Sequence, residues 1–280
     1  MDEEVHKIEA NGARIPALGL GTWTLKGEDC ADLVAHALDI GYRHLDTAGS
    51  YGNEADVGEG LRRSGLARDD VFVTTKVWWT DLAPADFRRS AEESLERLKL
   101  DQVDLLLIHW PNPKVPLAET IEALNRARAD GLARHIGVSN FPTDLLAEAL
   151  SLSDAPLVAN QVEHHPYLDQ SKVHAACRKA GMAMTSYCPL ARGGDLFAEP
   201  AVAVAAKAHA KTPGQIVLRW HVQQDGVVAI PRTTRKERLA ENIDIFDFAL
   251  TDTEMTAISA LGVKNARICD FDFSPKWDTA

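Results

Sequence analysis

The chain has 280 residues, 45% of them hydrophobic and 25% charged, which suits a globular protein with a sizeable core, arranged as one large α/β barrel or two ordinary domains. Its 30 lysine and arginine residues against 41 aspartate and glutamate residues give a formal net charge of −11, which argues against binding to nucleic acid or to an anionic membrane. No apolar run approaches the ~20 residues of a membrane span, and the acidic start at Met1–Glu4 is unlike a signal peptide, so we expect a cytoplasmic protein without a membrane partner.

The first residues predict a β-hairpin, and strand patterns alternate with helix patterns after it. The strand-like segments His6–Glu9 and Arg14–Ile15 flank Asn11-Gly12, and Asn-Gly is the strongest short signal for a hairpin turn. Short apolar runs then predict eight strands, at Ala17–Gly21, Tyr42–Asp46, Val71–Lys76, Val103–His109, Arg134–Ser139, Leu157–Val162, Met182–Tyr187 and Val227–Pro231.

Helix-spaced apolar residues fill the gaps between these strands. One predicted helix, Gly214–Gln224, has Pro213 in its first turn and Thr212 as its N-cap, which are typical start signals. Several strands, such as Val103–Ile108, are almost wholly apolar, and this is typical of a parallel sheet covered by helices on both faces.

Eight strand–helix units in about 250 residues match the size of a (β/α)8 barrel. The competing doubly wound sheet would normally carry G-x-G-x-x-G after its first strand, and the sequence that follows Gly19–Gly21 lacks the third glycine. We therefore predict an α/β fold, a single (β/α)8 TIM barrel domain over residues 1–280, with the N-terminal β-hairpin closing its bottom.

Three ionisable residues end three consecutive predicted strands. Asp46, Lys76 and His109 end the second, third and fourth, and Tyr51 lies in the loop after Asp46. Alone, Lys76 could be a surface lysine and His109 a hydrogen-bonded core histidine. Because the carboxyl ends of barrel strands share one rim, however, the four residues are predicted to meet there.

These four residue types suit proton transfer at a carbonyl group. An ammonium ~4 Å from a phenol favours phenolate by up to ~4 kcal/mol at an effective dielectric near 20, so we expect Lys76 to lower the pKa of Tyr51, with burial opposing it. Asp46 would hold Lys76 charged, and His109 would donate to a carbonyl oxygen or pass a proton with Tyr51. The set lacks a nucleophile with an adjacent base, so acyl transfer is not expected.

Ordered motifs continue along nearly the whole chain. They are Leu20–Trp23, His44–Glu54, Lys76–Trp78, Ile108–Pro111, Gly137–Phe141, Asn160–Glu163, Ile230–Thr233, Glu241–Asn242 and Phe246–Phe248. In this order they resemble the aldo-keto reductases. The chain length and short C-terminus most resemble the bacterial branch that includes 2,5-diketogluconate reductases.

The resemblance implies reversible, NADPH-dependent reduction of aldehydes or ketones, such as diketo-sugar acids or other small carbonyl compounds, with Tyr51 as the proton donor and Asp46, Lys76 and His109 completing the catalytic set. It also implies a set of contacts to the nicotinamide half of NADP(H). By resemblance, the side chains that hold the carboxamide are Ser139, Asn140 and Gln161, the ring stacks on Tyr187, and Gly21, Thr22, Trp23, Asp46, Cys188 and Leu190 fall where the family touches the cofactor.

A basic segment, Arg232–Arg238, follows the eighth predicted strand. Guanidinium groups grip phosphate bidentately, and this end of a barrel and a helix N-terminus both suit phosphate. By resemblance, Arg232, Thr233, Thr234 and Arg238 surround the adenosine 2′-phosphate, and Glu241 and Asn242 the adenine. Arg232 stands where lysine is more usual in the family. The positive charge is kept, so we predict that NADPH is preferred over NADH.

Tryptophans beside the rim residues predict an apolar substrate pocket. We expect Trp23, Trp78 and Trp110 to contact substrate, with Ser50 as a polar neighbour of Tyr51. Trp79 is expected to point to the opposite side if strand alternation persists. The loops at 111–117 and 189–200 and the tail at 270–280 are expected to set substrate specificity.

Two features of the sequence do not predict further chemistry. The segment Glu163–His165 has no second cluster of metal ligands at a suitable spacing, so no metal is expected. The four cysteines Cys30, Cys177, Cys188 and Cys269 form no C-x-x-C pair, and we expect reduced thiols.

Two other classes of function stay open at this point. The family resemblance also allows a non-catalytic regulatory subunit that binds a nicotinamide cofactor. A metal-dependent barrel hydrolase would show H-x-H at the end of the first strand, where this chain has Gly19–Thr22. We expect a monomer that acts on a small-molecule carbonyl substrate and has no nucleic-acid partner.

Overall fold

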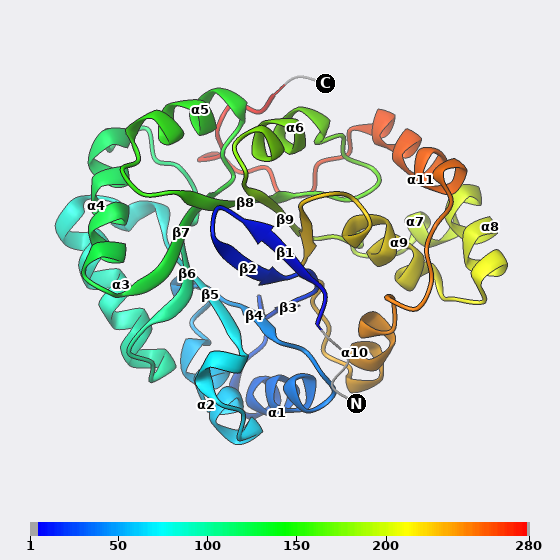
Figure 1. Cartoon of the computed structure of the whole chain (residues 1–280), viewed down its shortest axis with the longest axis horizontal. Helices are drawn as coiled ribbons and strands as arrows, with labels where there is room; N and C mark the ends of the chain where they lie inside the picture. Colours follow the sequence, from blue (N-terminus) through cyan, green and yellow to red (C-terminus); the bar gives the residue numbers. More distant parts are fainter. Residues whose placement is uncertain (1–4, 279–280) are drawn as a thin grey trace.

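Eight parallel strands form the centre of the computed structural model, which describes residues 5–278. Each strand pairs with the next along the chain, and the sheet curls until its first and last strands meet (Figure 1). Backbone hydrogen bonds of 2.9 Å from Gly19 N to Ala229 O and from Ala229 N to Ala17 O close the ring, which confirms the predicted barrel. The strands are β3 (Leu20–Gly21), β4 (His44–Asp46), β5 (Phe72–Val77), β6 (Val103–Ile108), β7 (Ala133–Ser139), β8 (Leu157–Glu163), β9 (Ala183–Tyr187) and β10 (Val227–Ala229).

Helices surround this barrel and cover its outer face (Figure 1). The predicted start of α9 is confirmed, because Thr212 Oγ1 accepts from Gln215 N and Gln215 Oε1 accepts from Thr212 N, a capping box. None of the helices within residues 5–278 has the length and apolar content needed to cross a bilayer. The helices are α1 (Gly27–Asp39), α2 (Glu54–Ser64), α3 (Pro84–Leu98), α4 (Leu117–Ala129), α5 (Thr143–Leu152), α6 (Ser171–Lys179), α7 (Asp195–Ala198), α8 (Pro200–His209), α9 (Pro213–Val222), α10 (Lys236–Ile243) and α11 (Asp252–Ser259), with 3-10 turns η1 (Gly49–Tyr51), η2 (Arg68–Asp70), η3 (Trp79–Asp81) and η4 (Ala260–Lys264).

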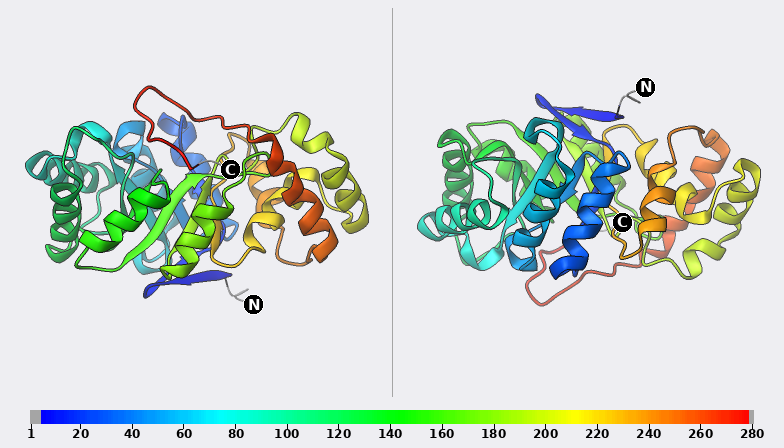
Figure 2. Two further views of the ribbon diagram at one scale, coloured as in Figure 1. Left: turned by 90° about the horizontal axis from the view of Figure 1, so that it is seen from above. Right: turned by 90° about the horizontal axis from the view of Figure 1, so that it is seen from below.

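The predicted N-terminal hairpin, β1 (Lys7–Ala10) and β2 (Ala13–Pro16), closes one end of the barrel. Asn11 and Gly12 both have positive φ, as a type I′ turn requires. The Asn11 amide donates to Leu157 O, where β8 begins, so the hairpin lies at the end where the strands start. Figure 2 shows the hairpin and the C-terminal tail at opposite ends of the molecule.

Gly21 lies where β3 meets the chain that follows β10. A Cβ built on Gly21 would lie 2.7 Å from Ile230 O, and this backbone atom cannot swing away as a side chain could. Gly21 N also donates to Pro231 O at 3.0 Å, so the two segments are held together at this point. Closure of the barrel therefore excludes a side chain at Gly21, independently of any cofactor contact.

Replacing Gly21 with Ala should lower the free energy of unfolding by about 1–3 kcal/mol, because the added methyl overpacks the closure of the barrel. The measurement is urea denaturation of the purified protein. Gly214→Ala is the matched control, since its Cβ would meet no atom nearer than 3.7 Å and it lies in the first turn of α9. A loss of stability of the same size in both variants would contradict this explanation.

Candidate active site

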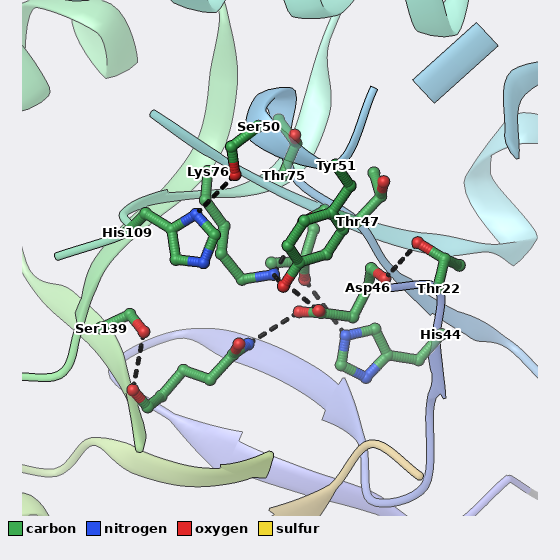
Figure 3. A network of polar contacts seen from close by, with 12 residues as sticks. Thr22, His44, Asp46, Thr47, Ser50, Tyr51, Thr75, Lys76, His109 and Ser139 are labelled. Atoms are coloured by element: carbon green, nitrogen blue, oxygen red, sulfur yellow. Dashed lines mark hydrogen bonds and ion pairs between the residues drawn. The ribbon is translucent and has the colours of Figure 1, made fainter. Parts of the chain in front are cut away.

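The structure brings the four predicted rim residues together at the carboxyl ends of three neighbouring strands. Asp46 ends β4, Lys76 lies near the end of β5, and His109 directly follows β6. The turn η1 carries Tyr51 over them (Figure 3). The Lys76 ammonium lies 2.6 Å from Asp46 Oδ1 and donates to the Tyr51 hydroxyl at 3.4 Å. The alternation of strand and helix thus assembles one polar group from three separate segments.

Lys76 and Asp46 form a buried ion pair with nearly complete hydrogen bonding. Their side chains are 0% and 2% exposed. The ammonium donates three hydrogen bonds, to Asp46 Oδ1, to the Thr47 carbonyl at 2.7 Å and to the Tyr51 hydroxyl. The second oxygen of Asp46 accepts from the Gln161 amide at 2.7 Å. This satisfaction of both charges is what makes such a pair tolerable inside a protein.

Tyr51 departs from the sequence prediction in the direction of its pKa. Burial raises the pKa of Tyr51 well above its ordinary value, and the negative charge of Asp46 adds to the effect. The expected net lowering of this pKa by Lys76 is therefore wrong for this structure. The ammonium lies closer to Asp46 than to the phenol, so desolvation of the phenolate outweighs its attraction. As a result, Tyr51 holds its proton at neutral pH.

His109 is a neutral imidazole in this site. Burial lowers the pKa of His109 well below its ordinary value, and the positive charge of Lys76 lowers it further. The ring meets the Tyr51 ring edge-on at 5.6 Å between centroids and the Trp78 ring at 4.9 Å. Its Nδ1 lies 3.4 Å from the Ser50 hydroxyl. Ser50, predicted as a substrate contact, therefore touches the His109 ring.

The residues that the resemblance assigns to the nicotinamide lie on the adjoining part of the rim. The Tyr187 hydroxyl donates to Asn140 Oδ1 at 2.8 Å, and Asn140 Nδ2 donates to His109 O at 2.9 Å. The Ser139 hydroxyl donates to Gln161 O at 2.8 Å, while the Gln161 amide reaches Asp46. A single network thus joins this group to the four rim residues.

The segment directly after β3 and the loop after β9 flank this network. The Thr22 hydroxyl donates to Asp46 O at 2.9 Å, whereas Trp23 is 52% exposed. Cys188 has positive φ, and its thiol forms a hydrogen bond with Cys269 of the tail that lowers the pKa of Cys188, with desolvation opposing it. Leu190 is half-buried and packs against the apolar core. The structure therefore places these predicted residues around the rim, with Trp23 turned largely to solvent.

The basic segment lies at the N-terminus of α10. Arg232, Thr234 and Arg238 are exposed there. Arg232 donates to Thr24 Oγ1 at 2.5 Å, and Arg238 pairs with Glu241 at 2.6 Å. Exposed guanidinium groups and hydroxyls before a helix N-terminus are chemistry that fits a phosphate. Thr233 is half-buried, and Asn242 is buried behind the segment.

Aromatic rings of the tail pack over the rim tryptophans. Phe273 lies 5.7 Å from Trp78 and 5.5 Å from Trp110 between ring centroids, and Trp277 lies 5.9 Å from Trp110. Trp79 stacks on Phe273 at 5.1 Å, so the expectation that it points away is wrong. The reason is that η3 begins at Trp79, which ends the alternation of the strand. The sequence analysis did not predict that rings of the tail contact the rim tryptophans. The only signal for it in the sequence is the cluster of aromatic residues near the C-terminus.

A buried carboxylate holds this tail in place. Glu163, fully buried at the end of β8, accepts from the backbone N–H groups of Ile268 and Cys269 at 2.6 Å each and contacts His165 Nε2 at 2.9 Å. His164 Nδ1 contacts Ser186 Oγ.

Within residues 5–278, no three His, Cys, Asp or Glu side chains gather as a metal-binding group.

A rim of this composition on a (β/α)8 barrel suits proton transfer at a carbonyl oxygen. The model of the Aldo/keto reductase family matches residues 17–262, and the chain belongs to this family. It is accordingly an NADP-dependent enzyme that reduces carbonyl groups.

Several relatives share most of their length with this chain. A morphine 6-dehydrogenase of Pseudomonas putida is 42% identical over 90% of this chain and 89% of its own, and a methylglyoxal reductase of Yersinia pestis is 41% identical over 94% and 99%. A crystal structure proposed to be that of a 2,5-diketo-D-gluconic acid reductase B is 48% identical, covers 98% of both chains and superposes with a TM-score of 0.96. A Bombyx mori aldo-keto reductase in complex with NADP is 35% identical over 95% of both chains, with a TM-score of 0.88. These relatives are named as enzymes, which disfavours a non-catalytic regulatory subunit.

Replacing Asp46 with Asn should lower the free energy of unfolding by about 3–5 kcal/mol, because the buried Lys76 ammonium loses its counter-charge. Adding Lys76→Met to the same chain should recover part of this loss, since no unpaired charge then remains. Urea denaturation measures both effects. The control is Asp86→Asn in the exposed Arg89–Asp86 pair, which should cost less than about 1 kcal/mol. Equal losses for Asp46→Asn and Asp86→Asn would show that the buried pair has no special importance.

Proposed function

We propose that Tyr51 is the proton donor in the NADPH-dependent, reversible reduction of small aldehydes and ketones by this enzyme. The observation that carries the proposal is the Tyr51 hydroxyl 3.4 Å from the buried Lys76 ammonium. A donor must hold its proton before the reaction, and the raised pKa of Tyr51 meets this requirement. The ammonium then lies where the phenolate charge develops.

Each rim residue has a distinct role in this proposal. Tyr51 gives its proton to the carbonyl oxygen, while NADPH, when bound, supplies the hydride for the carbonyl carbon. Lys76 stabilises the phenolate that Tyr51 becomes, and Asp46 keeps Lys76 charged and fixed in position. Neutral His109 donates an N–H to the same carbonyl oxygen and orients it. In the oxidation of an alcohol these roles run in reverse.

For NADP(H) we propose two groups of contacts. Tyr187 would stack on the nicotinamide ring, with Ser139, Asn140 and Gln161 on its carboxamide, and this rests on the network that joins them to His109 and Asp46. Exposed Arg232, which precedes α10, and Arg238, which lies in its first turn, would hold the 2′-phosphate. The remaining proposed contacts are Gly21, Thr22, Trp23, Cys188, Leu190, Thr233, Thr234, Glu241 and Asn242.

The substrate class is proposed from the rings around the rim and from the relatives. Trp78 and Trp110 border His109 and the tail rings, which supplies apolar walls beside a few polar groups. Exposed Trp23 would contribute from the loop after β3. Relatives named for methylglyoxal, diketogluconate and morphine support compounds with a ketone, an aldehyde or the corresponding alcohol.

We propose that residues 1–280 act as one domain and as a cytoplasmic monomer without a nucleic-acid partner. The continuous hydrogen-bonded barrel supports one domain. The net charge of −11 supports the absence of an anionic partner.

Replacing Tyr51 with Phe should reduce kcat by about 10²–10⁴-fold with methylglyoxal or a simple aldehyde, because the ring stays and only the acidic proton is lost. NADPH oxidation followed by absorbance measures kcat, and fluorescence titration measures the Kd for NADPH, which should not change. A Tyr51→Phe enzyme with nearly native kcat would disprove the role of Tyr51 as proton donor.

Replacing Arg232 with Ala should raise the Kd for NADPH about tenfold and leave that for NADH unchanged, since only NADPH carries the 2′-phosphate. Arg126→Ala removes the same charge from exposed α4, on another side of the barrel, and is the control. If Arg232→Ala weakened both cofactors equally, the assignment of the phosphate site would be wrong.

A further inference from the structure

The Ser50 hydroxyl contacts one ring nitrogen of His109. Ser50 lies in the middle of η1, directly before Tyr51, and its Oγ is 3.4 Å from His109 Nδ1. Figure 3 shows the other ring nitrogen of His109 on the side toward the Tyr51 hydroxyl and Lys76. The two ring nitrogens thus face different environments: Nδ1 faces a hydroxyl, and Nε2 faces the place where a carbonyl would react.

The protonation state of His109 makes this contact consequential. The imidazole is neutral, because burial and Lys76 both lower its pKa. A neutral imidazole carries one proton, so one nitrogen donates and the other accepts. A hydrogen bond at one nitrogen therefore decides what the other nitrogen can do.

A serine hydroxyl can take either part in this contact. If Ser50 donates to Nδ1, the ring proton must lie on Nε2, and Nε2 can donate to a carbonyl oxygen. If Ser50 instead accepts from Nδ1, then Nε2 is a bare acceptor and would repel that oxygen. Only the first arrangement lets His109 donate to the carbonyl oxygen, which is the role that the proposed function gives it.

We propose that Ser50 is a positioning residue that fixes the tautomer of His109, its O–H donating to Nδ1 so that the ring proton stays on Nε2. Ser50 acts through His109 and need not touch the substrate, which replaces the simpler expectation of a substrate contact. The inference rests on the proposed function, in which His109 orients the carbonyl.

The geometry of η1 links this role to that of Tyr51. Both side chains come from one three-residue turn, closed by Tyr51 N donating to Ala48 O at 3.0 Å. The side chain of Ser50 is otherwise exposed, so an added methyl group has room. The turn thus carries both Tyr51, the proposed proton donor, and Ser50, which orients His109.

The test compares Ser50→Ala with Ser50→Thr, which removes the hydroxyl in one variant and keeps it in the other. The tautomer of His109 is measured by ¹⁵N NMR on the histidine-labelled protein without cofactor, with the His109 signals assigned by their loss in His109→Gln. Steady-state kinetics with methylglyoxal and fluorescence titration with NADPH are measured on the same preparations.

In the native protein and in Ser50→Thr, we expect the proton on Nε2. In Ser50→Ala, we expect a mixture of tautomers and a fall in kcat of roughly two- to tenfold, the size of one hydrogen bond, with the Kd for NADPH unchanged. Recovery of both properties in Ser50→Thr would show that the hydroxyl matters rather than the packing of the turn.

Two results would overturn the inference: a proton on Nδ1 in the native protein, or native kcat and tautomer in Ser50→Ala. These outcomes are separate from a failure of the proposed function. An active Tyr51→Phe enzyme would remove Tyr51 as proton donor while the NMR result for Ser50 still held, and an inactive Tyr51→Phe with a fully active Ser50→Ala would remove only the inference.

Discussion

The buried pair of Lys76 and Asp46 is the interaction on which the rest of the site depends. It binds β4 to β5 at the rim, and through Gln161 it reaches across the barrel to β8. Removing two charges from water is costly, so the pair persists only because nearly every donor and acceptor around it is satisfied. The same arrangement fixes the ammonium beside the Tyr51 hydroxyl, where the proposed mechanism places the developing charge.

Burial raises the pKa of Tyr51, and this pair helps to explain why the nearby ammonium does not lower it. Asp46 holds the lysine charged, but it also neutralises much of the positive potential that would otherwise draw the proton from the phenol. The resting site therefore keeps the phenol protonated, and in the proposed mechanism the ammonium stabilises the charge that forms when the proton leaves. The sequence identifies the carboxylate, the ammonium and the phenol. It does not predict which effect on the pKa of Tyr51 is larger, because that depends on burial and on distances of a few ångströms.

Other parts of the structure were predictable to different degrees for similar reasons. The strands and the hairpin follow from local patterns, such as apolar runs and Asn11-Gly12, and the structure confirms them. The side of the barrel to which Trp79 turns was not predictable, since a short 3-10 turn interrupts the strand pattern without a clear signal. The contact between Glu163 and Cys269 joins segments 106 residues apart and leaves no local trace.

The C-terminal tail is held by hydrogen bonds at both of its ends. Glu163 holds it at Ile268 and Cys269, and Asp278 holds it to Thr143, accepting from that residue's backbone N–H at 3.0 Å. Between these fastenings, the aromatic residues form a strap over the rim tryptophans, and Phe271 and Phe273 take no part in either fastening. A change of one ring would therefore alter the surface over Trp78 and Trp110 and leave both fastenings in place.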